Sequence, residues 1–533
     1  MRRSVPPAPP SPTTLPDAPP PPFVETPRPG RISEKGSARR EATAPAYTES
    51  GFRFERVRSY SFALGPGGEP VEIGSGRFAR VYLGFERRGE ASADAARPVV
   101  IKMMQRDMDE GDATRFRMEK ALLEHLQGHP SIVELISSGS ITDPGLPDGI
   151  WAECEGDYLV LERLDMNLEE RLKGSRDPRA KEDLLALDIR DRLLRVLEYM
   201  VPVASAIEFA HIERNVCHRN INPSNVLIRL PDPKLAGSTM QIRLADFSAA
   251  KMEDQEGVTR FAFSVPGTMY FQSPEQEVNI LELLVNVKHG SKDVEYFEDL
   301  FVNVAKNDTF AIFNHTEEYP IASVDRVKKR ITLDAAYRGG TEQNVRAHVQ
   351  KSVGRPADIY SLGALFYYLI SGATRSPKAL NDTFVKFVEY SGPAETNTIE
   401  GFLRGEYAAI EAARARTAES APGDMMFPYQ QFTDGTGAPI PIEIMTVIAR
   451  AMIRNKADSY CQGWDLDTTG VTTMLRDVVA LYGLLGLRPT AAVHHTVVHA
   501  SSAPRGASLT LARTTNAIGK LYESIVAFFR RRR

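Results

Sequence analysis

The apolar pattern changes its period near Asn167, and this change constrains the fold more than any other feature of the 533-residue chain. Before that point, short strand-like runs precede a single helical pattern, at 70–73, 81–85, 99–103 and 114–126. After it, apolar residues recur with helical spacing, as in 192–211 and 358–370. Because strands and helices bury side chains at different intervals, the sequence predicts a small sheet-rich lobe followed by a larger helical lobe.

A second strand-like region interrupts the helical lobe. Between 294 and 336, short apolar runs alternate with turn-forming clusters, the runs lying at 301–305, 309–313, 321–324 and 330–333. Turn signals at this spacing predict a small β-rich module. Two interpretations are open: the module is a tolerated surface insertion, or it blocks, replaces or recruits a substrate or docks a partner.

Both ends of the chain differ from these lobes. Twelve of the first thirty residues are proline, a composition that cannot repay the entropy of ordering. We therefore expect a disordered tail over 1–50, acting as a linker or as a polyproline II ligand. At the other end, 488–533 is expected to form a linker and an amphipathic basic helix. Within it, 508–533 has an apolar stripe and four final arginines, typical of packing on protein or of weak contact with a partner or an anionic membrane.

Composition narrows the class of partner. The formal charge of −4 gives no reason to expect nucleic-acid binding. Cys154, Cys217 and Cys461 lie far apart without metal-ligand spacing, which indicates a reducing compartment. No secretory signal is complete at the start, and no apolar run reaches the roughly 18 residues of a membrane span. We expect a cytoplasmic protein.

Candidate phosphate-binding residues lie in the sheet-rich lobe. Gly74, Ser75 and Gly76 fall between two predicted strands, where glycine allows backbone amides to approach phosphate oxygens. Taken alone, this stretch could equally be a simple hairpin. Lys102 on the next strand and Glu119 on the following helix strengthen the case, because an ammonium held by a carboxylate can bind the α- and β-phosphates of a nucleotide.

Three further stretches complete the pattern: HRNINPSN at 218–225, LADFS at 244–248 and SPEQ at 273–276. In this order the chain resembles the eukaryotic-like (Hanks-type) serine/threonine protein kinases, and the last stretch is similar to their bacterial branch. The resemblance covers roughly 70–485 without the insertion. It implies an α+β, bilobal protein-kinase fold with a small β-rich N-lobe, a larger helical C-lobe and a β-rich insert before the central C-lobe helix.

The resemblance also implies domain boundaries. The N-lobe and hinge are expected over 51–164, and the catalytic and activation segments of the C-lobe over 165–275. The β-rich insert then occupies 276–352, and the rest of the C-lobe 353–487.

Site roles follow from the same resemblance. Lys102 is expected to bind the α/β-phosphates of ATP and to pair with Glu119, while Asn225 and Asp246 hold magnesium. The remaining nucleotide-binding residues cover the phosphates, receive adenine on the hinge main chain or sandwich its ring; they are Gly74, Ser75, Gly76, Glu162, Leu164, Val81, Val100 and Leu227. Asp358 is expected to hold the backbone of the catalytic loop.

The family pattern breaks at Asn220 and Asn222. Asn220 stands where the family has the aspartate that accepts the substrate proton, and an amide is no useful base at neutral pH. Asn222 replaces a lysine whose charge faces the transferring phosphoryl group. We therefore expect a protein that binds ATP and magnesium and acts as a signalling pseudokinase or a very slow kinase. The alternative is an active serine/threonine kinase that transfers the γ-phosphate to protein hydroxyls using another base. Both imply a protein partner or protein substrate.

Two smaller departures accompany this break. Ser248 replaces the glycine that usually follows Asp-Phe, which limits the freedom of the backbone there. Ser459 stands where an arginine often pairs with the carboxylate that matches Glu275.

Overall fold

The computed structural model describes residues 49–487, except for 56–57, 77, 89–95, 142–145, 253–269, 279, 299–303, 305, 307, 326, 392–397, 418–428, 455 and 462–469. The predictions for the proline-rich tail up to 48, for most of the run 301–305 and for the C-terminal helix at 508–533 lie outside the described residues. No helix in the described ranges is long and apolar enough to cross a membrane.

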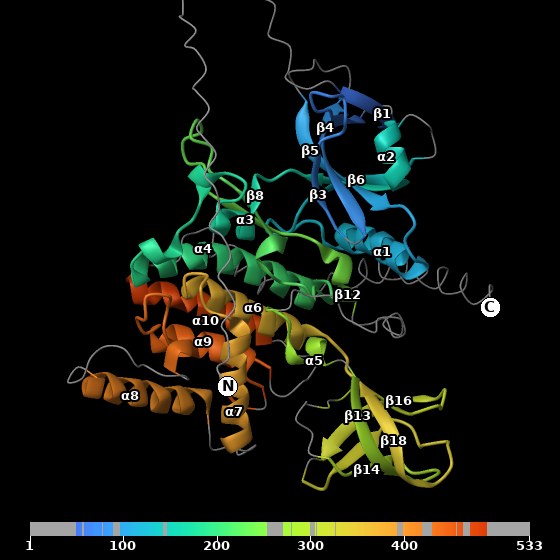
Figure 1. The fold of residues 1–533 in the computed structure, drawn as a ribbon, viewed down its shortest axis with the longest axis vertical. Helices are drawn as coiled ribbons and strands as arrows, with labels where there is room; N and C mark the ends of the chain where they lie inside the picture. The colour runs from blue at the N-terminus through green and yellow to red at the C-terminus, as the bar shows by residue number, and fades with distance from the viewer. Residues whose placement is uncertain are drawn as a thin grey trace, which may run out of the picture. The chain divides into compact units, whose positions relative to one another are not determined.

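An antiparallel sheet forms the N-terminal lobe (Figure 1). Its strands are β1 (Glu49–Glu55), β2 (Arg58–Ala63), β3 (Glu72–Ser75), β4 (Ala79–Arg88), β5 (Arg97–Gln105), β6 (Leu135–Ser140) and β7 (Cys154–Glu162). They run in the order β1-β2-β4-β5-β7-β6, and β3 pairs with β4 beside this path. Strand β1 begins two residues before the predicted boundary of the tail, and it and β2 had no counterpart in the predicted strands.

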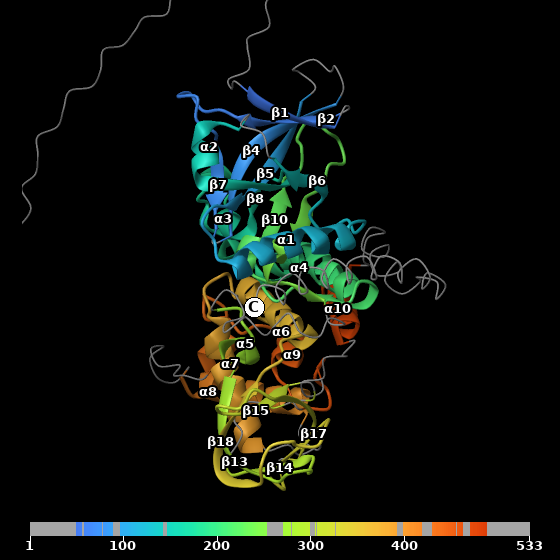
Figure 2. The same ribbon diagram turned by 90° about the vertical axis from the view of Figure 1, so that its right-hand side faces the viewer.

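The alternation of side chains along β5 gives the sheet two different faces. Val99, Ile101 and Met103 are fully buried on one face, in a core that includes Ile150 of the short helix α2 (Asp148–Glu153). Figure 2 shows α2 beside this sheet. Because successive strand residues point to opposite faces, Val100 and Lys102 face the other side.

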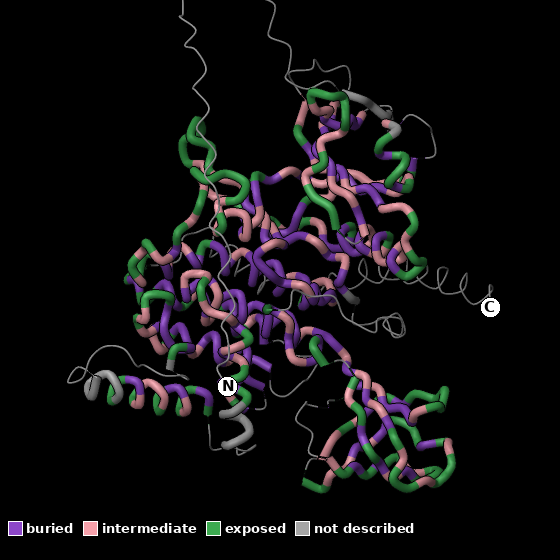
Figure 3. The backbone as a smooth tube through the Cα atoms, viewed as in Figure 1, coloured by how far each residue is buried: buried purple, intermediate pink, exposed green. Residues whose placement is uncertain are grey.

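The helical lobe is built around one nearly fully buried helix, α6 (Arg355–Ile370). It packs against α4 (Ile189–Glu208) and α9 (Ile442–Met452). The other helices are α3 (Leu168–Lys173), α5 (Pro274–Glu277), α7 (Pro377–Ser391), α8 (Ile399–Thr417) and α10 (Gly470–Ala480). The lobe also contains short strands, which are β8 (Met166–Asn167), β9 (Val216–Cys217), β10 (Val226–Arg229), β11 (Gln241–Leu244) and β12 (Lys251–Met252). Strands β9 and β10 flank the stretch 218–225 in sequence. In Figure 3 the centre of this lobe is mostly purple, as expected for a buried core.

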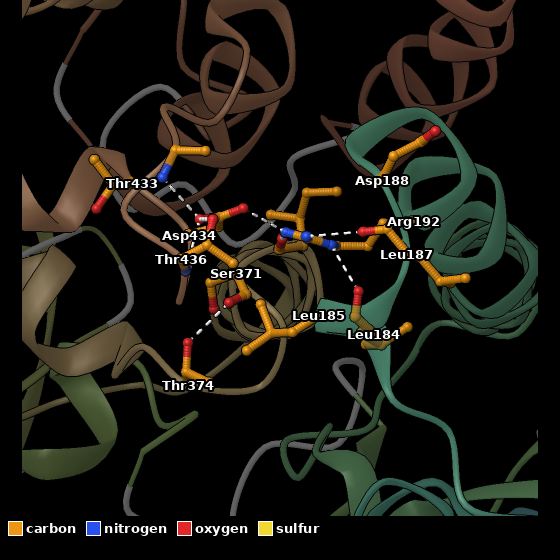
Figure 4. Close-up of polar contacts among 12 residues, drawn as sticks. Leu184, Leu185, Leu187, Asp188, Arg192, Ser371, Thr374, Thr433, Asp434 and Thr436 are labelled. Atoms are coloured by element: carbon orange, nitrogen blue, oxygen red, sulfur yellow. Dashed lines mark hydrogen bonds and ion pairs between the residues drawn. The ribbon is translucent and has the colours of Figure 1, made fainter.

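A buried ion pair joins distant segments of the helical lobe (Figure 4). Arg192 of α4 donates to Asp434 at 2.8 Å and to the backbone carbonyls of Leu184 and Leu187 at 2.8 and 3.0 Å. Asp434 also accepts the N–H groups of Thr436 and Ala438 at 2.9 Å each. Because both charges have further hydrogen bonds, their burial is compensated.

The insertion forms a closed barrel with its own core. Its strands are β13 (Ile280–Val287), β14 (Asp293–Tyr296), β15 (Thr309–Ile312), β16 (Glu318–Asp325), β17 (Arg330–Leu333) and β18 (Glu342–Gln350). They close in the order β13-β14-β17-β16-β15-β18, and residues such as Leu283 and Val285 point into the core. The bilobal α+β fold with a β-rich insert is thus confirmed. All six strands lie within 276–352, the range predicted for the insert. The strand-like runs read between 294 and 336 did not include β13 and β18, which close the barrel.

Four buried charges fix the base of the barrel to the helical lobe. Asp308, just before β15, accepts hydrogen bonds from Lys351 Nζ and from the backbone N–H of Ser352. The charge of Glu275 in α5 also acts on Lys351, and Arg454 donates to Glu275 at 3.3 Å. The exposed fractions of Asp308, Lys351, Glu275 and Arg454 are 1%, 6%, 1% and 5%. In such an alternating series, removing one member leaves its partner as an uncompensated buried charge.

Replacing Lys351 with Met should therefore destabilise the full-length protein. The change leaves the carboxylate of Asp308 buried without its cation, and removing one partner of a buried pair costs about 3–5 kcal/mol. Urea unfolding measures this loss. Lys328→Met, at an exposed barrel position, is the matched control and should have little effect. The double variant Asp308→Asn/Lys351→Met should recover part of the stability; a single variant as stable as the parent would contradict the role of the charges.

Candidate active site

Lys102 and Glu119 are held together between the sheet and α1 (Glu110–Leu126). Lys102 Nζ lies 2.7 Å from both carboxylate oxygens of Glu119 and 3.5 Å from Oδ1 of Asp246. Asp109 caps α1 by accepting the N–H of Asp112 at 2.8 Å, which fixes where the helix begins. Burial acts to lower the pKa of Lys102, but the two carboxylates raise it above its usual value. A charged ammonium is therefore available to phosphate oxygens.

The loop from 218 to 225 is held by one carboxylate of the central helix. Asp358 of α6 accepts the backbone N–H groups of His218 and Arg219 at 2.7 and 2.6 Å, and His211 Nε2 lies 2.8 Å from it. Burial acts to raise the pKa of Asp358, but His211 and these contacts lower it. The aspartate is thus placed as the sequence predicted, with its charge retained.

Three asparagines in this loop form one hydrogen-bonded group. Asn222 Nδ2 donates to the backbone oxygen and to Oδ1 of Asn220, at 3.1 and 3.0 Å. Asn225 Nδ2 donates to the same backbone oxygen at 2.8 Å. Asn222 is only 1% exposed, and its Oδ1 accepts the N–H of Ser224 at 2.9 Å. Asn222 therefore caps the turn Pro223–Asn225 instead of reaching outward as a lysine would.

Asp246 faces Lys102 across the site. It has a positive φ of 63°. The next residue, Phe247, is buried, and its ring centroid lies 4.6 Å from the ring centroid of His218. Burial acts to raise the pKa of Asp246, but Lys102 and hydrogen bonds from Ser248 lower it. Ser248 thus adds a partner to the carboxylate in the place where the family usually has glycine.

The residues predicted to hold magnesium have the right chemistry. Asp246 offers a carboxylate whose side chain is 36% exposed. Because Asn225 uses its amide nitrogen on the backbone of Asn220, its oxygen is the end available to a cation. Two oxygen ligands beside nucleotide phosphates suit Mg²⁺.

The predicted nucleotide residues of β4 and β5 share one face of the N-lobe sheet, and Leu227 lies on β10 of a second sheet. Val81 pairs with Lys102 across β4 and β5, and Val100 lies two residues earlier on β5, so all three share one face. Val81, Val100 and Leu227 are half-buried, as a surface for an aromatic ring requires. At the end of β7, the side chain of Glu162 accepts bonds from Arg229 and Arg243, and its backbone N–H donates to the carbonyl of Glu134 at 3.0 Å. The adenine contact of the main chain from Glu162 to Leu164 stays a prediction.

The glycine-rich turn is open. Gly74, Ser75 and Gly76 are exposed, and a Cβ built on either glycine would meet no atom closer than 3.9 Å. The Gly76 N–H donates to the carbonyl of Ala79 at 2.9 Å and closes the hairpin. The glycines are thus not needed to avoid clashes within the protein, which fits a role in ligand approach.

The structure corrects one expectation and adds one contact. Ser459 leaves no gap beside Glu275, because Arg454, five residues earlier, donates to that carboxylate. Ser459 instead bonds backbone carbonyls such as that of Ile453, at 2.7 Å. Gln276, which sequence reasoning missed as a site residue, donates to the backbone oxygen of Arg219 at 2.7 Å. For the contact with Glu275, the sequence offered one signal, an arginine on the same segment as Ser459. For the contact of Gln276 with the loop, it offered none.

This two-lobed fold, with a lysine–glutamate pair facing a catalytic-type loop, defines the class of protein kinases. Residues 69–280 match the family model for the protein kinase domain. Over this part of the chain, the match confirms the resemblance to protein kinases that was found in the sequence.

Curated relatives agree. The chain is 28% identical to a calcium/calmodulin-dependent protein kinase type 1 of Macrobrachium nipponense, over 37% of this chain and 46% of that protein. It is 29% identical to serine/threonine-protein kinase PknF of Mycobacterium tuberculosis, over 30% and 33% of the two chains. It is 28% identical to serine/threonine-protein kinase PkaB of Streptomyces coelicolor, over 38% and 41%. The chain spans less than half the length of each of these relatives.

Lys102→Met tests the nucleotide role of the site. Because a hydrogen bond to a charged group contributes about 1.5–3 kcal/mol, the affinity for MgATP should fall about tenfold or more. Isothermal titration calorimetry measures the change. Lys120→Met removes a partly exposed lysine of α1, the helix that carries Glu119, and should leave affinity unchanged. Equal losses in the two variants would exclude a specific role of Lys102.

Proposed function

We propose that this protein binds ATP with magnesium and acts as a signalling pseudokinase or a very slow serine/threonine kinase. One observation carries the proposal: Asn220 occupies the position of the catalytic base within a site whose other parts are assembled. The binding of MgATP is supported by the Lys102–Glu119 pair, by the side-chain oxygens of Asn225 and Asp246, and by the fixed loop 218–225. The amide of Asn220 supports impaired phosphoryl transfer.

The loss of transfer has two parts. An amide cannot take a proton at neutral pH, and general-base catalysis typically contributes about 10²–10⁴-fold. In addition, Asn222 is buried and neutral, so it supplies no charge to the phosphoryl group, and such preorganised charge is a main source of rate in this reaction. Positioning alone then supports only a slow reaction.

The alternative function is an active serine/threonine kinase. The contacts of Lys102 with Glu119 and Asp246 favour it, since both carboxylates must be in place for phosphoryl transfer. An active enzyme would need another base, and the transition state is loose enough that positioning could carry much of the catalysis.

Restoring the family residues separates these two functions. Asn220→Asp should raise the rate of transfer to a generic protein substrate by about 10²–10⁴-fold, because a carboxylate can accept the hydroxyl proton. Asn220→Asp/Asn222→Lys tests whether the missing charge adds to this. Initial rates with radiolabelled ATP measure the effect. A parent protein that already works at an ordinary rate of about 1 s⁻¹ would refute the pseudokinase function.

We further propose that the barrel recruits the protein partner or substrate and that the protein works in the cytoplasm. The barrel begins three residues after α5, and the segment around α5 is the platform for protein substrates in this family. Its buried anchor at Asp308 and Lys351 supports a defined orientation over a loose surface insertion.

Deleting residues 290–345 should remove the binding of partners while MgATP binding is kept. Affinity capture from the native host followed by mass spectrometry measures the first, and a thermal shift with MgATP verifies the second and shows that the kinase domain remains folded. An unchanged set of captured proteins would contradict recruitment by the barrel.

A further inference from the structure

The orientation of the Asn220 amide follows from hydrogen-bond donors and acceptors alone. The backbone N–H of Ser224 can only donate, so the atom of Asn222 that lies 2.9 Å from it must be the oxygen. The nitrogen of Asn222 is then the end that faces Asn220. Because this nitrogen can only donate, Asn220 must present its own Oδ1 to it, at 3.0 Å.

The nitrogen end of Asn220 is therefore directed away from Asn222. Among the described residues, no hydrogen-bond acceptor takes up this Nδ2, and the side chain is half-buried rather than fully enclosed. A carboxylate at this position would offer acceptors and a negative charge. The amide offers two N–H donors and no charge.

A hydrogen-bond donor at position 220 suits an acceptor oxygen, whereas a base suits the hydroxyl proton of a substrate. In the family, the residue here faces the substrate hydroxyl beside the γ-phosphate, which is rich in acceptor oxygens. We propose that Asn220, turned by Asn222, binds the γ-phosphate of ATP and makes the site selective for a nucleoside triphosphate over a diphosphate. This inference rests on the proposed binding of nucleotide and names its specificity.

Asn222 acts here as a positioning residue. It is 1% exposed and has bonds at both ends of its amide, so it does not reach a nucleotide itself. An aspartate at 222 would still accept the N–H of Ser224 but could not donate to Asn220. The Asn220 amide would then turn its nitrogen toward Asp and its oxygen outward.

Calorimetric titration of the full-length protein with MgATP and MgADP tests this. The parent should bind MgATP about tenfold or more tightly than MgADP, as expected for hydrogen bonds to a charged group. In Asn220→Asp, and likewise in Asn222→Asp, the ratio of the two dissociation constants should fall about tenfold, with MgADP affinity nearly unchanged. The retained MgADP affinity also shows that each variant is folded.

Asn314→Asp is the matched control, since it adds the same charge at an exposed turn of the barrel; its ratio should equal that of the parent. Equal affinities of the parent for both nucleotides would overturn the γ-phosphate role and leave nucleotide binding intact. A ratio unchanged in Asn220→Asp would overturn it as well. Binding of neither nucleotide at millimolar concentration would refute the proposed function itself.

Discussion

The rest of the structure depends on the buried carboxylate of Asp358. It is fully buried on the central helix α6 and holds the N–H groups of His218 and Arg219. Arg219 has a positive φ of 66°, an unfavourable conformation for a non-glycine residue that needs support from its surroundings. Gln276 holds the other side of this residue by donating to its carbonyl. The loop that carries the asparagines is thus fixed from α6 and from α5.

These two supports lie on either side of the barrel in sequence. Strand β13 begins four residues after Gln276, and β18 ends eight residues before Asp358. Since β13 and β18 pair along most of their length, the two ends of the insertion are close together. The charges of Asp308, Lys351, Glu275 and Arg454 then bind this base to the C-lobe. The insertion is therefore continuous with the structure that holds the active-site loop.

Part of the binding site is independent of the missing base. Lys102 contacts Glu119 and Asp246 rather than Asn220 or Asn222, so the proposed binding of nucleotide phosphates can persist when the base is absent. Replacing a carboxylate with an amide also removes a negative charge from beside the nucleotide, which should favour a triphosphate. In the proposed function, the substitution that weakens transfer therefore also strengthens the retention of ATP.

The sequence by itself determined the fold class and the order of the site residues. Motif spacing within one strand, one helix or one loop sets local geometry, so Lys102, Glu119, Asp246 and Asp358 lie where the pattern predicts. Only the tertiary structure decided the direction of the Asn222 side chain and the closure of the barrel by β13 and β18. It also decided that Arg454, and not position 459, supplies the partner of Glu275. Each of these features depends on which hydrogen-bond partner or strand comes within reach after folding. Such partners are often distant in sequence, so the spacing of residues does not predict them.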